Sequence, residues 1–211
     1  MVPMTSHFPP SESPAEQSGP HRIVLLRHGQ TEWSESGQHT GLTDLPLTAT
    51  GREQAIGLAR LLGRLELVEP LVLSSPRRRA VDTAKLAGLA VEETTEDLSE
   101  WNYGDYEGLT TEQIREHTPG WTVWTHACPA GETAESVQHR ADAILTRAAT
   151  QTAHRDVVLV GHGHFSRTLL ARWVRLAVAN GIHFRMSPGG VAVLGHDHGR
   201  PQIAAMNLTV D

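Results

Sequence analysis

The sequence lacks several features that would place it in particular classes of protein. Its 211 residues include a single cysteine, Cys128, which excludes an internal disulfide and suits a reducing compartment. No apolar run is long enough to span a bilayer, so we expect no membrane partner. The formal net charge of -6 shows no excess of basic residues, and we therefore expect no nucleic-acid partner either.

Patterns typical of a metal site are missing as well. The pairs His162/His164 and His126/Cys128 each stand two residues apart. Neither pair has the i, i+4 spacing of a helical zinc site or the clustered Cys and His residues of a structural one. We therefore expect neither a metal ion nor another cofactor.

What the sequence does contain is typical of one globular domain. It is 39% hydrophobic and 20% charged, and it is long enough for an α/β domain with its own core. Residues 1–20 are rich in Pro, Ser and Glu, which predicts a disordered tail before a single domain at residues 21–211. The tail lacks the basic start and apolar run of a secretory signal, so we expect a cytoplasmic protein.

Short apolar runs alternate with longer segments whose apolar residues recur at helical spacing. Buried strands are predicted over residues 23–26, 71–73 and 157–160, and two more over 191–194 and 202–206 with a hairpin turn at 196–199. Helices are predicted after the N-cap Thr48, from 74–76 with a proline in the first turn, over 111–117, from about Thr133, and over 165–179. This alternation predicts an α/β three-layer sandwich, in which helices cover both faces of a mostly parallel central sheet.

Three of the predicted strands run directly into polar motifs. These motifs are Arg27-His28-Gly29, Ser74-Ser75-Pro76 and Gly161-His162-Gly163. The carboxyl ends of parallel strands meet at one edge of a sheet, where such folds bind ligands. Arginine there is suited to anions, imidazole can act as nucleophile or base, and a helix beginning at Pro76 adds positive potential. We expect Gly29 to let the backbone turn sharply, and the whole edge to bind a phosphate dianion.

The motifs resemble those of a known family. Arg27–Trp33 and Thr40–Thr48 are similar to the opening signature of the histidine phosphatase superfamily, also called phosphoglycerate-mutase-like. Ser75–Ala84, Glu100–Gly108 and Leu159–Gly163 resemble its later motifs, in the family's order. The resemblance covers about residues 22 to 208 and implies the phosphoglycerate-mutase-like fold.

The resemblance also implies a role for each motif residue. His28 corresponds to the nucleophile, Glu100 to the proton donor, with Glu107 as a less favoured choice, and Arg79 and His162 to the phosphate-binding pair. Arg27 joins them as an anion clamp. Secondary contacts to phosphate or substrate are expected from Gln30, Thr31, Thr40, Gly41 and Gly163.

The activity implied is metal-independent hydrolysis of phosphomonoesters of small metabolites through a phosphohistidine. A bisphosphoglycerate-dependent mutase is the alternative, but residues 109–111 lack lysine and residues 116–139 contain no Lys or Arg to hold a second anion. A phosphoprotein phosphatase and a non-catalytic phosphate-binding module are less favoured. The residues within these motifs most resemble those of small actinobacterial acid phosphatases and fungal sedoheptulose-1,7-bisphosphatases.

Two questions stay open from the sequence. Trp121 and Trp124 could cover the pocket or pack in the core. A lid formed by residues 100–130 would suit a small metabolite, whereas an open groove would suit a phosphoprotein. The family resemblance also makes a homodimer possible.

Overall fold

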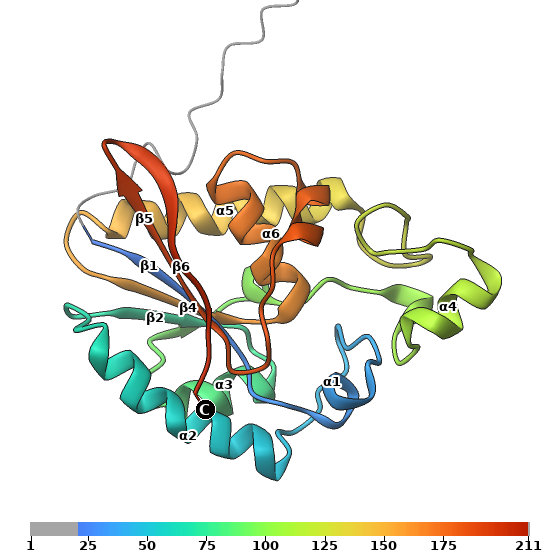
Figure 1. Cartoon of the computed structure of the whole chain (residues 1–211), viewed down its shortest axis with the longest axis horizontal. Helices are drawn as coiled ribbons and strands as arrows, with labels where there is room; N and C mark the ends of the chain where they lie inside the picture. Colours follow the sequence, from blue (N-terminus) through green and yellow to red (C-terminus); the bar gives the residue numbers. More distant parts are fainter. Residues whose placement is uncertain (1–20, 211) are drawn as a thin grey trace, which may run out of the picture.

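The computed structural model describes residues 21–210, and the tail predicted for residues 1–20 lies outside this range (Figure 1). Six strands form one sheet in the order β3-β2-β4-β1-β5-β6. The strands are β1 (Ile23–Arg27), β2 (Leu71–Ser74), β3 (Glu93–Thr94), β4 (Val157–Gly161), β5 (Val191–Asp197) and β6 (Arg200–Leu208). β1 to β4 are parallel, while β5 and β6 are antiparallel to their neighbours, so the predicted mostly parallel sheet is confirmed.

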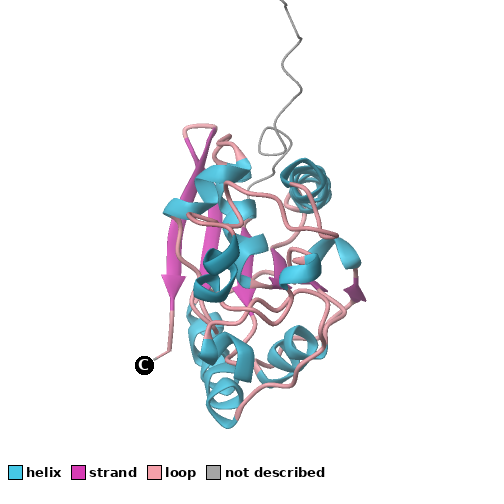
Figure 2. Cartoon of the chain, turned by 90° about the vertical axis from the view of Figure 1, so that its right-hand side faces the viewer, coloured by secondary structure: helices cyan, strands magenta, loops and turns pink. Residues whose placement is uncertain are grey.

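Helices cover both faces of the sheet, as predicted (Figure 2). They are α1 (Glu32–Ser36), α2 (Ala49–Arg64), α3 (Arg78–Leu86), α4 (Thr111–His117), α5 (Ala134–Gln151) and α6 (Gly163–Trp173), with 3-10 turns at Glu96–Leu98, Gly104–Tyr106 and Val178–His183. α2 and α3 lie on one face, and α5 and α6 lie on the other (Figure 1). No helix within residues 21–210 combines the length and apolarity needed to cross a bilayer.

The run of apolar residues in β1 follows from this three-layer arrangement. Ile23 and Leu25 pack in the core cluster that contains α5 and α6, whereas Val24 and Leu26 pack in the cluster under α2 and α3. Successive side chains of a strand point to opposite faces, so a strand covered on both faces needs apolar residues at every position.

The parallel pairing of β2, β4 and β1 brings the three polar motifs together. Val160 on β4 is in register with both Leu26 on β1 and Ser74 on β2. The residues that follow these positions therefore leave the sheet at the same edge. This confirms the expected meeting of the motifs that follow Leu26, Leu73 and Val160.

Two predicted helix boundaries are wrong. α3 begins at Arg78 and not at residues 74–76, because its first turn is capped from a distant loop: the Asp44 carboxylate accepts the Arg78 amide hydrogen (2.8 Å). α6 ends at Trp173 and not at residue 179. Its last carbonyls accept the amides of Arg175 and Leu176, with Arg175 in the left-handed conformation at φ 64. The short α1 and β3 were not predicted, whereas α4, the N-cap Thr48 and the helix expected from about Thr133 are confirmed.

Candidate active site

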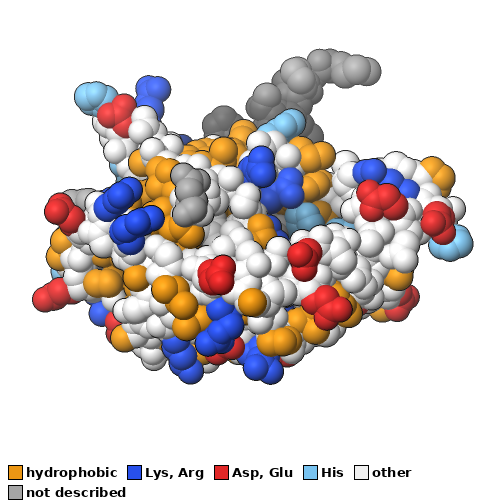
Figure 3. Space-filling view, turned by 60° about the horizontal axis from the view of Figure 1, so that its bottom comes forward, with side chains coloured by type: hydrophobic (Ala, Val, Ile, Leu, Met, Phe, Trp, Pro, Cys, Tyr) orange, Lys and Arg blue, Asp and Glu red, His pale blue; other side chains and the backbone are white. Residues whose placement is uncertain are grey.

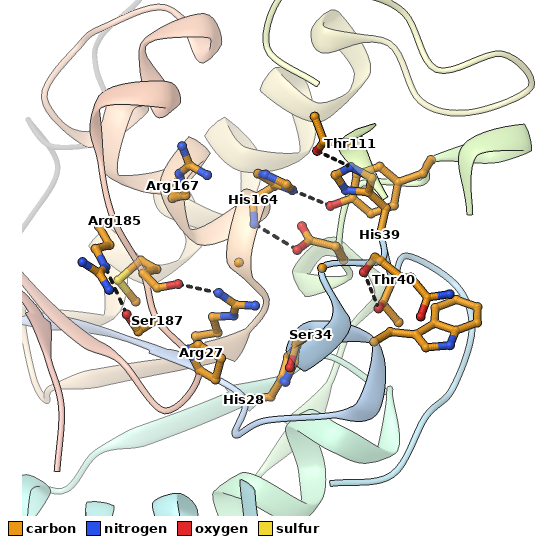
Figure 4. Close-up of a pocket in the computed structure, with 18 of the residues that line it drawn as sticks. Arg27, His28, Ser34, His39, Thr40, Thr111, His164, Arg167, Arg185 and Ser187 are labelled. Atoms are coloured by element: carbon orange, nitrogen blue, oxygen red, sulfur yellow. Dashed lines mark hydrogen bonds between the residues drawn. The ribbon is translucent and has the colours of Figure 1, made fainter. Parts of the chain in front are cut away.

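A cavity of about 530 Å³ opens at the carboxyl ends of β1 and β4. Figure 4 shows side chains from the loop after β1, from the start of α6 and from the segment before β5 converging on it. Five of the ten predicted site residues line it: Arg27, His28, Thr40, Glu100 and Gly163. The other five, Arg79, His162, Gln30, Thr31 and Gly41, are absent from the lining.

His28 is buried, with 4% of its surface exposed, and its ring is held in one orientation. Nδ1 lies 2.6 Å from the carbonyl oxygen of Gly29, which can only accept a hydrogen bond. Nδ1 therefore carries the proton, and Nε2 keeps its lone pair. Burial lowers the pKa of His28 well below the usual 6.5, and the charges of Arg79 and Arg27 lower it further. The imidazole is thus neutral and nucleophilic at neutral pH.

Gly29 is required for close packing rather than for a left-handed turn. A Cβ at this position would lie 2.3 Å from the Gly51 carbonyl oxygen, while the φ angle of Gly29 is outside the left-handed range. The Gly29 amide donates to the Thr83 hydroxyl (3.0 Å). The loop that carries His28 is therefore pressed against the start of α2, and this close approach is a reason for glycine that the sequence did not indicate.

Arg27 lines the cavity and carries one unpaired, buried donor. Its Nη1 donates to the Met186 carbonyl (2.6 Å), but its buried Nε meets no acceptor within residues 21–210. A Cβ on Gly163 would come within 2.9 Å of the guanidinium carbon, so this glycine lets Arg27 lie against the start of α6. An unsatisfied buried cationic N–H favours binding of an anion.

Arg79 is fully buried behind His28 and outside the cavity lining. Its guanidinium donates to the carbonyls of Thr40, Gly41 and Thr43 and to Nδ1 of His162. These bonds hold the loop that precedes α2, including the predicted contact residues Thr40 and Gly41. Arg79 therefore places a buried positive charge near His28 and fixes the position of this loop.

His162 has both ring nitrogens occupied by protein groups. Nδ1 accepts from Arg79 Nε (3.2 Å), so the proton of the neutral ring is on Nε2 and is donated to the Ser75 hydroxyl (2.8 Å). Burial, followed by the charge of Arg79, lowers its pKa well below 6.5. Its ring centroid is 5.2 Å from that of His28. The structure thus places His162 beside His28 rather than in the cavity lining.

Glu100 is held at the beginning of α6. Oε1 accepts the amides of Trp101 (2.9 Å) and Phe165 (2.8 Å), and Oε2 accepts the amide of His164 (2.9 Å). Two of these donors belong to the first turn of the helix, whose amides need external acceptors. Glu100 is 6% exposed and lines the cavity, and Oε2 has one acceptor position left for a proton.

Glu107, the less favoured candidate for the proton donor, holds a loop in place. Its carboxylate accepts the amides of Gly41 (2.9 Å) and Thr43 (3.0 Å) and lies outside the cavity lining. Glu107 thus binds backbone amides of the loop that precedes α2, and Arg79 binds backbone carbonyls of the same loop. The geometry therefore favours Glu100 over Glu107.

Two other predicted contact residues have local structural partners. Thr31 is fully buried and caps α1, where its hydroxyl accepts the Ser34 amide (3.2 Å). The side-chain carbonyl of Gln30 accepts the Thr48 hydroxyl (2.8 Å). Both residues shape the loop after His28, and neither lines the cavity.

The uncharged rings of His39, Tyr103 and His164 line one part of the cavity, and this wall of rings was not predicted. His39 and His164 stand 5.7 Å apart between ring centroids, and His164 shares a hydrogen with the Tyr103 hydroxyl (2.6 Å). Burial lowers the pKa of His39 to about 4 and that of His164 well below 6.5. Trp121 and Trp124 pack in the core behind this wall, which answers the question left open by the sequence.

Two further arginines, Arg167 and Arg185, also line the cavity. Neither carried a recognisable sequence signal, because each lies several residues beyond the motif that precedes it. Within residues 21–210, no three His, Cys, Asp or Glu side chains cluster so that they could hold a metal ion. Burial raises the pKa of the Cys128 thiol to about 11, as befits an unreactive core residue.

Comparisons with known proteins agree with this arrangement. The sequence pattern of the Histidine phosphatase superfamily (branch 1) matches residues 23–209. An acid phosphatase of Mycobacterium tuberculosis is 54% identical over 189 residues, which are 90% of this chain and 93% of the relative. A sedoheptulose 1,7-bisphosphatase of Saccharomyces cerevisiae is 36% identical over 188 residues, covering 74% of this chain and 69% of the relative.

Solved structures share the whole fold. The structure of the open reading frame Rv3214 from Mycobacterium tuberculosis superposes with a TM-score of 0.88 at 54% identity. The match covers 90% of this chain and 98% of that one. The sheet, its two helical layers and the edge that carries the cavity are therefore common to both.

Proposed function

Because this chain belongs to the histidine phosphatase superfamily, we propose that it hydrolyses phosphomonoesters of small metabolites through a phosphohistidine on His28. The observation that carries the proposal is the state of His28: a buried, neutral ring with Nδ1 bound to a carbonyl and Nε2 free. Beside it Arg27, whose buried Nε has no partner among the described residues, and the carboxyl group of Glu100 line the cavity. Relatives named as phosphatases support the same reaction class.

The first half of the reaction transfers the phosphoryl group to the protein. Nε2 of His28 attacks phosphorus, the N–P bond forms, and the bond to the leaving oxygen breaks in line. Glu100 gives its proton to that oxygen, which leaves as an alcohol. Arg27 binds the equatorial oxygens, and the buried charge of Arg79 stabilises them from behind.

The second half returns the site to its starting state. Water attacks the phosphorus of the phosphohistidine, and Glu100, now a carboxylate, removes a proton from it. The N–P bond breaks, and its electron pair returns to Nε2. Inorganic phosphate leaves, and the proton taken from water again resides on Glu100.

The alternatives differ in what receives the phosphoryl group. A mutase returns it to a substrate, which requires a bound bisphosphate, and the segment 116–139 carries no cation for this purpose. Residues 100–130 provide Glu100, Tyr103 and Thr111 to one wall of the cavity, and their two tryptophans pack in the core. The cytoplasmic location and the homodimer stay predictions from the sequence.

The experiment that tests this function is phosphate release measured with EDTA present. We expect p-nitrophenyl phosphate and a panel of sugar phosphates to be hydrolysed at the same rate with and without the chelator, since the mechanism uses no metal ion. Rapid quenching should trap a chain heavier by one phosphoryl group. Loss of activity in EDTA, or coupled turnover of 3-phosphoglycerate to its isomer at a comparable rate, would contradict the proposal.

The pH dependence follows from the lowered pKa of His28. A protonated imidazole has no lone pair to attack phosphorus, so activity is present above the pKa of His28 and is lost as the pH falls through it. Because that pKa is depressed, kcat/KM should show no loss from His28 on passing below 6.5, where an ordinary imidazole takes up its proton. An NMR titration of His28 checks this, and a midpoint near 6.5 would refute it.

A further inference from the structure

A single peptide group connects Arg27 to a residue of the edge strand β6. The carbonyl of Met186 accepts a hydrogen bond from Arg27 Nη1 (2.6 Å), and the amide of the next residue, Ser187, belongs to the same peptide group (Figure 4). That amide donates to Oδ1 of Asn207 (2.6 Å). No peptide bond within residues 21–210 is cis, so the N–H and the C=O of this planar group point in opposite directions. Asn207 and Arg27 therefore bind the two ends of one rigid plane.

The backbone of β6 is shaped to present the Asn207 side chain. β6 lies at the edge of the sheet, beside β5 (Figure 1). The register of the two strands shifts between Val191 and Val193, so that two residues of β6, one of which is Asn207, stand opposite Ala192. Such a β-bulge redirects a side chain. Asn207 has a φ angle of 53, in the left-handed region that asparagine enters more readily than most residues with a side chain.

The Asn207 side chain lies directly against a tight turn. The Gly190 amide donates to the Ser187 carbonyl (2.8 Å) and closes a four-residue turn. Pro188 is its second residue, and Gly189, with φ 67, is its third, an arrangement typical of a type II turn. A Cβ on Gly190 would lie 2.9 Å from Oδ1 of Asn207. Glycine at this position thus makes room for the asparagine.

The same turn binds the backbone of the candidate site. The Gly189 amide donates to the His28 carbonyl (2.9 Å), and the Gly190 carbonyl accepts the Arg27 amide (3.0 Å). These bonds fix the position of the turn, but they do not act on the peptide group that precedes it. The Ser187 amide has one hydrogen to donate, so its bond to Asn207 fixes the rotation of that group.

The guanidinium of Arg27 depends on this rotation. Within residues 21–210, the Met186 carbonyl is the one acceptor that its nitrogens meet, and the buried Nε has none. If the carbonyl turned away, the guanidinium would lose its single polar contact with the protein. Hydrogen bonds that share one peptide group also polarise one another, so the bond to Asn207 strengthens the bond to Arg27.

We propose that Asn207 is a positioning residue for the reaction: by holding the Ser187 amide, it keeps the Met186 carbonyl and the Arg27 guanidinium in the orientation that binds the transferred phosphoryl group. The inference rests on the proposed phosphatase function. The cavity is the hollow of Figure 3, in which a histidine is visible with Lys and Arg atoms beside it, and Asn207 is not among the residues that line it. Asn207 therefore acts through one peptide group and without touching the substrate.

The test removes the acceptor and leaves the backbone unchanged. Asn207→Gly does this, because glycine adopts a positive φ without strain. We expect kcat/KM for p-nitrophenyl phosphate to fall by about 10- to 100-fold, the loss typical of a displaced catalytic group. Asn207→Asp retains a side-chain acceptor and tolerates the left-handed region, so it should stay within about threefold of the wild type. His198→Gly is the matched control, since His198 also has a positive φ, 49, and lies in the exposed turn before β6; it should keep the wild-type rate.

A double-mutant cycle separates positioning from a general loss of structure. In an Arg27→Met background the positioned group is absent, and Asn207→Gly should lower kcat/KM by less than about twofold further. Two losses that multiply would overturn the proposal, as would an Asn207→Gly variant as active as the wild type or an Asn207→Asp variant as slow as Asn207→Gly. The wild type alone also tests the bond: the Ser187 amide hydrogen should exchange at least about 10²-fold more slowly than a free amide, and an unprotected amide would contradict the proposal.

Calorimetric binding of inorganic phosphate makes the test independent of turnover. Asn207→Gly should weaken this binding by about tenfold in the chain that carries Arg27 and leave it unchanged in the Arg27→Met chain. A wild type that hydrolyses no phosphomonoester would refute the proposed function. Equal phosphate affinities of Asn207→Gly and the wild type would refute the positioning role, and comparison of their thermal unfolding shows that both chains are folded.

Discussion

Replacement of His28 by alanine is expected to lower kcat for phosphate release by about 10⁵-fold or more, the scale on which enzymes lose activity when a nucleophile is removed. His28 is the cavity-lining imidazole whose Nδ1 is bound to a carbonyl while its Nε2 keeps a free lone pair, so its removal takes away the proposed attacking group. Phosphate release from p-nitrophenyl phosphate measures the loss. Mass spectrometry of quenched samples should show the phosphorylated chain in the wild type and its absence in the variant.

The matched control for this substitution is His198→Ala. His198 lies on the exposed turn between β5 and β6 and should retain the wild-type rate. Since His28 is buried, thermal unfolding of both variants must also be compared. A folded His28→Ala protein that still turns over and still forms a phosphoenzyme would show that another residue is the nucleophile.

The Glu100→Gln variant should lose activity to an extent set by the leaving group. For alkyl phosphates, whose alkoxide needs a proton, we expect kcat to fall by about 10²- to 10⁴-fold, the usual contribution of general acid catalysis. For p-nitrophenyl phosphate, whose phenolate leaves without a proton, the fall in the transfer step should be less than about tenfold. Single-turnover measurements on both esters give the ratio that identifies a proton donor.

Glu107→Gln provides the comparison for Glu100→Gln. Both carboxylates accept backbone amides, so each substitution disturbs hydrogen bonds of the same kind. Glu107 lies outside the cavity lining, and any loss of activity in its variant should be equal for the two esters. If the Glu100 variant also lost the same fraction of its activity toward both esters, the role of Glu100 would be structural.

The sequence was sufficient for the layers of the fold because its strongest signals are local. The apolar run Ile23–Leu26 requires burial on both faces, and Thr48 and Thr133 are local caps. Once the strands are parallel, the meeting of Arg27 and His28 with the motif at Gly161 follows from the register alone. These features depend on residues close together in the chain or on one topological rule.

Features that depend on distant partners escaped prediction. Asp44 caps α3 from 34 positions earlier in the chain, so α3 starts later than its own residues suggest. α6 ends through a left-handed Arg175, where the usual signal is glycine. In the candidate site, tertiary packing alone assembles the wall of His39 and His164, and it also places Arg79 behind the lining.

The support of Arg27 by Met186 has a consequence for how such enzymes diversify. Of the groups proposed for bond breaking, Arg27 and His28 are carried by the end of β1 and Glu100 by the segment after the turn Glu96–Leu98, whereas Arg185 is carried by a surface segment that contributes a single backbone carbonyl to the clamp. A backbone carbonyl is the same whatever side chain is attached to it. Mutation can therefore change the side chains of this segment other than the buried Met186, and with them the range of substrates accepted, while the clamp keeps its support. Selectivity and chemistry are in this way separately evolvable within one cavity.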